Sequence, residues 1–220
     1  SALSETGLSW NGEFVTGQVP AVLSPQSTMT VAGKRAGSAK GAYEVGDASF
    51  GPPLNAPGVK GELMPVVDQA DGSGLACAPL SAVNAKAVKG NIALVDRGEC
   101  SFVVKAKHVQ DAGAKGMVVA DNAPGAVTGL GGGDPAIAIP AVRISQAAGT
   151  GLKAALKKRT KTKSGVVVNL TIDPERLAGT DNARRIRMFV PAEFDPGSSV
   201  SHFTTDAKTN QLMEPSINAD

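Results

Sequence analysis

The 220-residue sequence has few aromatic residues, little histidine or cysteine, and no long apolar run. Aromatic residues make up 4%, and there are two histidines and two cysteines. No apolar run approaches the roughly 20 residues that cross a bilayer as a helix. The formal net charge is only +2, which gives the whole protein no general attraction to polyanions. We therefore predict neither a membrane span nor a nucleic-acid partner.

The scarcity of histidine limits the catalytic chemistry. A zincin carries two histidines at i and i+4 on a helix, with a glutamate as general base, and no HExxH segment occurs here. The only histidines are His108, which we expect on the exposed side of a helix, and His202. A GxSxG elbow is also absent, so a Ser-His-Asp triad has little support. We predict that this chain has no catalytic residues and no cofactor, and is not itself an enzyme.

What the sequence does contain suits an ordered domain of short strands and many turns. Apolar residues make up 42% and charged residues 19%, with 26 glycines and 14 prolines. The cysteines, Cys77 and Cys100, do not form a CxxC pair, which argues against a zinc ribbon or a redox motif. We predict a disulfide between them. Free thiols would contradict this bond and would also weaken the expectation of an extracellular location.

The middle of the chain alternates between strand and helix patterns. Short apolar runs bounded by glycine predict strands in "GELMPVVD", "GNIALVDRG", "GMVVADN", "IAIPAVRI" and "GVVVNLTI". Helical spacing of apolar residues follows Ser101 in "FVVKAKHVQDAGAKG", and Ser145 can cap a second helix in "QAAGTGLKAALKK". This order predicts a β-rich α/β fold.

The flanks differ in character, and we divide the chain accordingly. Residues 1–40 form an N-terminal extension, in which Asn11-Gly12 between apolar neighbours predicts a hairpin. Residues 41–175 form the central domain and residues 176–220 a C-terminal extension with one further strand candidate, 186–190. Both extensions are interpreted as pieces of a host protein.

The segments "GNIALVDRGECSFVVKAKHVQDAGAKGMVVADN" and "GGGDPAIAIPAVRISQAAGTGLKAAL" resemble the protease-associated (PA) domain. The resemblance implies a barrel-like or sandwich β core with two flanking helices. It also implies a non-catalytic module of secreted or lumenal peptidases and of sorting receptors, which binds protein segments or shapes substrate access. We therefore expect a secreted or extracellular protein whose partners are protein or peptide segments, including the substrate of an adjoining peptidase domain.

The C-terminal segment "GSSVSHFTTDAKTNQLMEPSIN" resembles the region of secreted bacterial metzincin-type metallopeptidases that follows an inserted PA domain. By this resemblance His202 is the third zinc ligand and Met213 the methionine of the turn beneath the metal. The other two histidines are expected before Ser1, so zinc belongs only to a longer host. The simpler interpretations are a loop histidine and a buried methionine. Calcium binding by Asp206, Glu214 and Asp220 has little support, because their spacing is not that of an EF-hand.

A glycine-rich loop is the candidate binding element. The segment "GLGGGDP" matches neither GxGxxG nor GxxxxGK[ST], which argues against nucleotide binding. We predict that Gly131, Gly132, Gly133 and Asp134 form a rim that binds an extended peptide. The basic run 157–163 has no interleaved aromatic residue, so we interpret it as a solvated face. Two alternatives to an accessory domain stay open: an autonomous extracellular binding module, and part of a zinc endopeptidase that includes His202.

Overall fold

The computed structural model describes residues 8–10, 12–181, 183–190, 196–197, 199, 202–204 and 207. Contacts divide the chain into a larger unit, Ser27–Ile172, and a smaller unit that combines Ser1–Gln26 with Asp173–Asp220. None of the helices within the described residues has the length and apolar character needed to cross a membrane.

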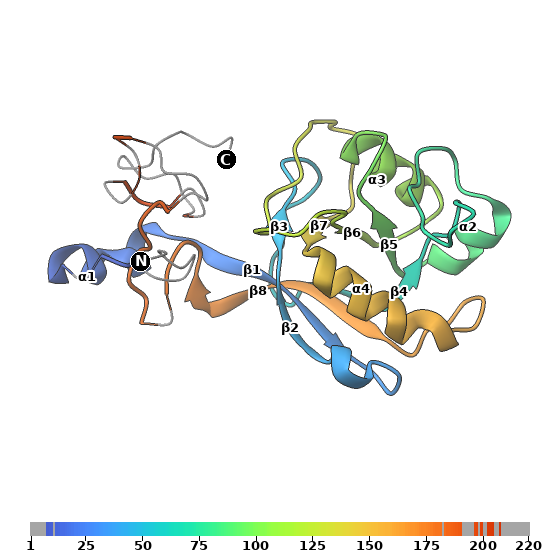
Figure 1. Ribbon diagram of the computed structural model, residues 1–220, viewed down its shortest axis with the longest axis horizontal. Coiled ribbons are helices and arrows are strands. Elements are labelled where there is room, and N and C mark those ends of the chain that lie inside the picture. The colour runs from blue at the N-terminus through green and yellow to red at the C-terminus, as the bar shows by residue number, and fades with distance from the viewer. Residues whose placement is uncertain are drawn as a thin grey trace. The chain divides into compact units, whose positions relative to one another are not determined.

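The larger unit is built on an open, mixed sheet (Figure 1). Its strands, in spatial order, are β2 (Gly41–Glu44), β1 (Pro25–Ala32), β8 (Val167–Leu177), β4 (Val59–Pro65), β5 (Ile92–Asp96), β6 (Gly116–Ala120), β7 (Ala141–Ile144) and β3 (Gly46–Asp47). The neighbours from β4 to β7 are parallel, whereas β8 pairs with β4, and β3 with β7, in the antiparallel sense. The predicted β-rich α/β class is confirmed, with the sheet open and not closed into a barrel.

Helices cover both faces of the parallel strands. Alternate residues of β5 enter two apolar clusters, Ala93 and Val95 on one face and Ile92 and Leu94 on the other. The first cluster includes residues of α2 (Ala82–Val88) and α3 (Phe102–Asp111), and the second includes Leu152 of α4 (Gln146–Ala155). Because both faces are covered, β5 and β6 are almost continuous apolar runs in the sequence, with a single charged residue, Asp96, at the end of β5.

Serine caps determine where the helices begin. Ser101 Oγ accepts a hydrogen bond from Val104 N at 3.4 Å, and Ser145 Oγ accepts one from Ala148 N at 3.2 Å. The predicted starts of α3 and α4 are therefore confirmed. The third helix, α2, was not predicted, because it is short and has a buried asparagine, Asn84, on its inner side. Two 3₁₀ turns, η1 (Gly37–Ala39) and η2 (Leu156–Lys158), complete the helical elements of this unit.

The smaller unit contradicts the predicted hairpin. Residues Glu13–Val22 form helix α1, and Gly12 has an extended backbone with φ of −66° where a type I′ turn needs a positive φ. Asn11 itself lies outside the described residues. Val19 of α1 packs in a small core with Leu177 and Ile186. The strand candidate at 186–190 contributes only isolated bridges, such as that between Met188 and Phe203.

Candidate binding crevice at the strand ends

The parallel strands bring polar side chains together at one edge of the sheet. β5 ends at Asp96, and β6 ends one residue before Asp121. Ligands of open α/β sheets bind outside the carboxyl ends of such strands. Two hollows of about 390 and 310 Å³ lie there, and both are lined by Arg97 and Asn122. We call them together the crevice.

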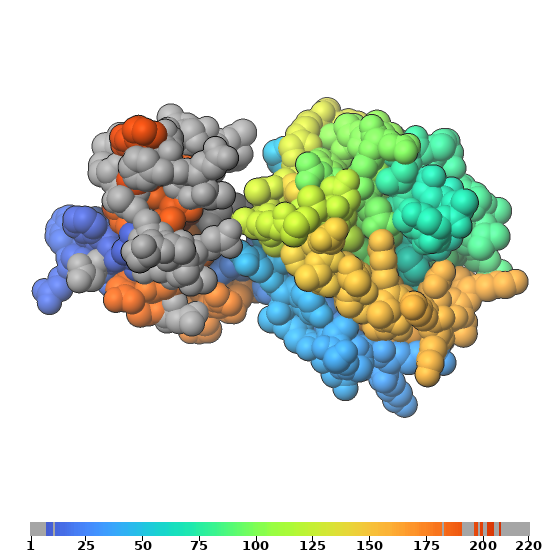
Figure 2. Space-filling view, in the orientation of Figure 1, coloured from blue at the N-terminus to red at the C-terminus, as the bar shows by residue number. Residues whose placement is uncertain are grey.

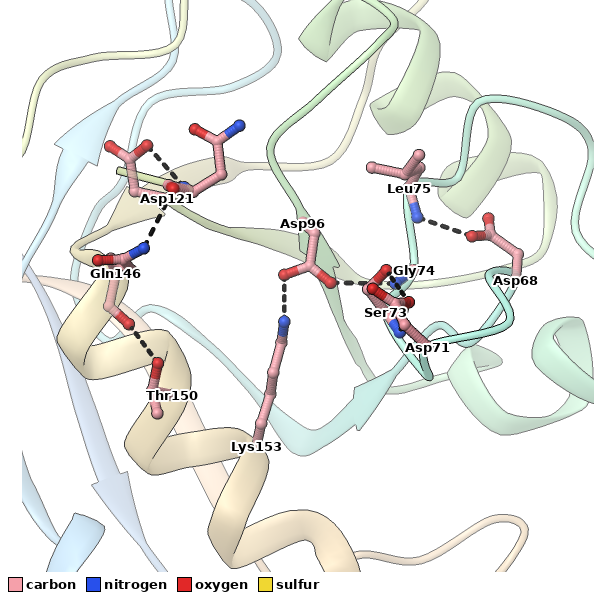
Figure 3. Close-up of polar contacts among 11 residues, drawn as sticks. Asp68, Asp71, Ser73, Gly74, Leu75, Asp96, Asp121, Gln146, Thr150 and Lys153 are labelled. Atoms are coloured by element: carbon pink, nitrogen blue, oxygen red, sulfur yellow. Dashed lines mark hydrogen bonds and ion pairs between the residues drawn. The ribbon is translucent and has the colours of Figure 1, made fainter. Parts of the chain in front are cut away.

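Asp96 connects the two sides of the crevice (Figure 3). Its Oδ2 accepts a hydrogen bond from Gly74 N at 3.0 Å, and its Oδ1 accepts one from Lys153 Nζ of α4. Asp68 shapes the same loop, because its carboxylate accepts from Leu75 N at 2.8 Å and from Ala76 N at 2.7 Å. These contacts hold the 68–76 loop as a wall of the crevice opposite α4 (Figure 3).

Asp121 is the buried carboxylate at the end of β6. Its Oδ2 accepts a hydrogen bond from Arg143 Nε at 2.7 Å, and its Oδ1 accepts from Arg97 Nη1 at 3.0 Å and from Asn122 N at 2.8 Å. Burial by itself would raise the pKa of this carboxyl, but the hydrogen bonds from Arg143 and Arg97 outweigh burial and lower the pKa. Asp121 is therefore an ionised anchor that orients Arg97, whose side chain is 40% exposed.

The predicted disulfide between Cys77 and Cys100 is present and joins the residue that directly follows the 68–76 loop to the loop after β5. Beneath it, Lys105 of α3 is fully buried and donates a hydrogen bond from Nζ to Leu75 O at 2.6 Å. Burial lowers the pKa of this ammonium, against the opposing effect of Asp68, Asp96 and Glu99.

His108 is not on a fully exposed face as we expected. It is half-buried, with Nδ1 at 2.9 Å from Ala76 O. The expectation rested on the apolar stripe of α3 alone. It failed because the disulfide-bonded loop covers the side of α3 that carries Lys105 and His108.

The loop after β5 contains an unusual backbone conformation. Glu99 has φ of +57°, a region that non-glycine residues seldom occupy, and follows Gly98 with φ of +147°. Glu99, Cys100 and Phe102 line the larger hollow. Such local conformations concentrate at functional sites, which supports the crevice as the candidate site.

The predicted peptide rim lies beside α3. Ser49 Oγ donates to Gly132 O at 2.6 Å, and a Cβ on Gly132 would lie 2.6 Å from Val103 of α3. Val103 follows Phe102, which lines the larger hollow. Gly131 and Gly133 are exposed, and Asp134 Oδ1 accepts from Ala136 N at 2.8 Å. Peptide binding by this rim stays a prediction.

The zinc-ligand prediction concerns the smaller unit. His202 is half-buried, and its carbonyl accepts a hydrogen bond from Phe189 N at 2.8 Å. In the part of the chain that the structure describes, no group of three or more His, Cys, Asp or Glu side chains is placed to hold a metal. Met213, Asp206, Glu214 and Asp220 lie outside the described residues. The role of His202 therefore stays a prediction for a longer host.

The charged residues of the crevice were not predicted from the sequence. Asp96 and Asp121 each directly end a buried apolar run, in "NIALVD" and "GMVVAD". Because the carboxyl ends of parallel strands meet at one edge, this repeated ending was a usable signal. The partners Arg143 and Lys153 had no comparable signal, since a strand arginine and a helix lysine usually face solvent.

One stretch of the chain matches a known protein family. Residues 59–152 match the family model of the PA domain. This range is less than half of the chain, but it contains every residue named in the crevice except Lys153. The PA match thus coincides with the sheet edge described above, and agrees with the resemblance seen in the sequence.

Curated relatives match part of this chain within much longer proteins. The chain is 39% identical over 108 residues to "Receptor homology region, transmembrane domain- and RING domain-containing protein 1" of Oryza sativa subsp. japonica, covering 49% of the chain and 19% of that protein. It is 44% identical over 64 residues to "Leucine aminopeptidase 2" of Arthroderma otae, covering 29% and 13%. The chain thus spans less than a fifth of either relative.

A solved structure supports the fold. The aminopeptidase from Aneurinibacillus sp. strain AM-1 superposes with a TM-score of 0.50 at 21% identity, over 78% of this chain and 42% of that one. At this identity the likeness concerns the fold alone.

Proposed function

We propose that this chain is a non-catalytic, PA-type interaction module of a secreted, peptidase-like host. It binds extended protein segments. In this way it regulates the access of substrate to a catalytic part outside the described residues, or positions the substrate for that part. The PA match of residues 59–152 and the aminopeptidase relatives support the peptidase association. The disulfide between Cys77 and Cys100 supports an oxidising, extracellular location.

The observation that carries this proposal is the set of hydrogen-bond donors and acceptors that line the crevice. Arg97 and Lys153 are each paired with a carboxylate, Asp121 and Asp96, and are still 40% exposed. Asn122, Gln146 and Thr150 add exposed donors and acceptors. Such a site offers hydrogen bonds of both kinds, as a peptide backbone requires. Asp71 and Glu99 also line the crevice, and this excess of carboxylates disfavours an anionic ligand.

A direct test screens the 220-residue protein against a display library of unstructured peptides and measures selected peptides by calorimetry. We expect Arg97→Gln to weaken binding about tenfold, the loss of one charge-assisted hydrogen bond. Arg184→Gln is the control, since Arg184 is an exposed arginine of the smaller unit. Deletion of Gly131–Gly133 tests the rim. Unchanged affinity in both Arg97→Gln and the rim deletion would overturn the proposal.

The non-catalytic part has its own test. The purified chain with added zinc should not release product from casein or from aminoacyl p-nitroanilides. Measurable turnover that a chelator abolishes would contradict the proposal.

The alternatives differ in the role of the flanks. In an autonomous binding module the flanks are only structural, and the peptide measurements stay as described. In a metzincin-type host, His202 would be a zinc ligand, so zinc-dependent proteolysis by the longer protein would be lost in His202→Ala. Full activity of that variant would remove His202 from the zinc site.

A further inference from the structure

Two segments of the larger unit carry a concentration of positive charge. They are the turn at 33–41, which includes η1, and the turn at 156–165, which follows α4 and includes η2. Together they hold eight exposed cations: Lys34, Arg35, Lys40, Lys157, Lys158, Arg159, Lys161 and Lys163. We call this surface the cationic face.

Specific contacts hold the two turns together. Arg35 N donates to Gly165 O at 3.1 Å, and Arg35 Nη1 donates to the carbonyl of Lys158. Gly33 has φ of +109°, and a Cβ there would lie 2.3 Å from Gly165 O, so only glycine permits this approach. Figure 2 shows the blue 33–41 atoms adjoining the orange atoms that follow α4 at the lower right. The cationic face is therefore a feature of the fold and not only of the 157–163 run.

The charge of this face is not neutralised within the described chain. Among the described residues, none of the eight cations has a side-chain nitrogen within 4.0 Å of a carboxylate oxygen. A carboxylate does lie beneath the second turn, since Glu62 accepts hydrogen bonds from Ser164 N and, at 3.2 Å, from Gly165 N. Glu62 thus binds the backbone of the turn. The eight cations face solvent, which favours an external polyanion as their partner.

The surrounding side chains narrow the partner chemistry. Tyr43 is a nearby aromatic residue. Its half-buried side chain packs against the second apolar cluster, and its hydroxyl donates to Ala39 O at 2.8 Å, so the ring is not an open platform for stacking a base. The large apolar side chains that are exposed in the described chain, such as Val83 and Val104, belong to other segments. A face without apolar residues has nothing to insert into a bilayer. Positive charge is therefore the property by which this face can recognise a partner, and it suits a flexible polyanion that carries sulfate or carboxylate groups.

We propose that the cationic face binds an anionic polysaccharide, such as a sulfated or uronic-acid-rich chain of a cell surface or matrix. The choice of a polysaccharide rests on the extracellular location in the proposed function. The face itself lies on the α4 side of the sheet and shares no residue with the crevice. The surface would tether the host protein to a charged matrix while the crevice stays open to peptides.

The test measures binding of heparin by calorimetry at several salt concentrations. One variant combines Lys34→Gln, Lys157→Gln, Lys161→Gln and Lys163→Gln. The matched control combines Lys86→Gln, Lys89→Gln, Lys107→Gln and Lys115→Gln, on or next to the helices of the opposite face. Each set removes four positive charges, which changes the formal net charge from +2 to −2. Thermal unfolding of both variants confirms that they are folded.

We expect the cationic-face variant to bind heparin at least about tenfold more weakly at ~0.1 M salt. The slope of log affinity against log salt should fall by about one per lysine removed, as for other polyanions. The control set should change affinity less than about threefold.

Three results would overturn the proposal: no heparin binding, equal losses in the two sets, or tighter binding to a single-stranded oligonucleotide or to phosphatidylglycerol vesicles. Arg97→Gln should leave heparin binding unchanged. The proposed peptide function and the polysaccharide proposal can therefore fail separately.

Discussion

Asp121 and Arg143 form an ion pair in which both partners are almost completely buried. The Asp121 side chain is 6% exposed and that of Arg143 is 9% exposed, with Nε at 2.7 Å from Oδ2. Arg143 also donates from Nη1 to Thr128 Oγ1 at 2.6 Å. The pair thus joins β7 to the end of β6 and to the loop that leads to the glycine rim.

Replacing Arg143 with methionine should destabilise the larger unit by about 3–5 kcal/mol, because a buried carboxylate loses its main partner. Urea unfolding measures this change in free energy. Arg184→Met is the control, since its pair with Glu175 is exposed and should contribute less than about 1 kcal/mol. Equal effects of the two substitutions would show that burial of the Asp121 pair has no energetic consequence.

The lowered pKa of Asp121 predicts acid sensitivity. The pKa of aspartate in the unfolded chain is about 3.9, and in the folded protein it lies lower. The unfolded state therefore binds the proton more readily, so this contribution to stability is present above about pH 4 and is lost as pH falls through the folded pKa. In Asp121→Asn the free energy of unfolding should fall less steeply below pH 4. Parallel curves for the two proteins would contradict the assignment.

Two glycines of α4 should respond oppositely to alanine. A Cβ on Gly149 would lie 2.6 Å from the Cβ of Ala120, whereas a Cβ on Gly151 would have no neighbour within 4 Å. We expect Gly149→Ala to destabilise the protein by about 1–3 kcal/mol through overpacking. Gly151→Ala should stabilise it by roughly 0.5–1 kcal/mol through helix propensity. Thermal unfolding of the two variants checks the packing of α4 on β6. A change in stability of the same sign in both variants would contradict this packing.

Loss of the disulfide should be costly. The cysteines are 23 residues apart, and a cross-link of this span stabilises a protein by about 3 kcal/mol, largely through the unfolded chain. The double variant Cys77→Ser, Cys100→Ser should unfold at a correspondingly lower urea concentration. Mass spectrometry with and without reductant confirms the bond in the starting protein. A double variant as stable as the parent would mean that the bond adds no constraint.

The sequence could predict the central strands because they are buried on both faces. Because residues such as Leu94 and Val118 are buried, the strands that contain them appear in the sequence as short apolar runs without alternating polar residues. Strand β1 was missed for the opposite reason, since "PQSTMTVA" buries only Met29 and Val31. Helix α2 was missed because Asn84 lies on its buried side, where its amide bonds both backbone groups of Val67.

The crevice was less predictable than the fold. Its parts come from the loops after β5 and β6, from α4 and from the 68–76 loop, which sequence patterns treat as separate surface segments. Their convergence depends on the parallel order of β5, β6 and β7, and strand order is not visible in hydrophobic periodicity. Only the aspartates that end the strands carried that information in the sequence.

The neighbouring positions of β1 and β8 in the sheet have a consequence for folding order. The smaller unit combines residues that precede the larger unit in the sequence with residues that follow it. These two halves of the smaller unit are therefore far apart until the intervening chain is compact. Pairing β1 with β8 brings the halves to within about one strand spacing, ~5 Å. It thereby removes most of the entropic cost of closing that long loop. The larger unit should therefore fold first and act as an intramolecular template, and mutations that unfold it should also unfold the smaller unit.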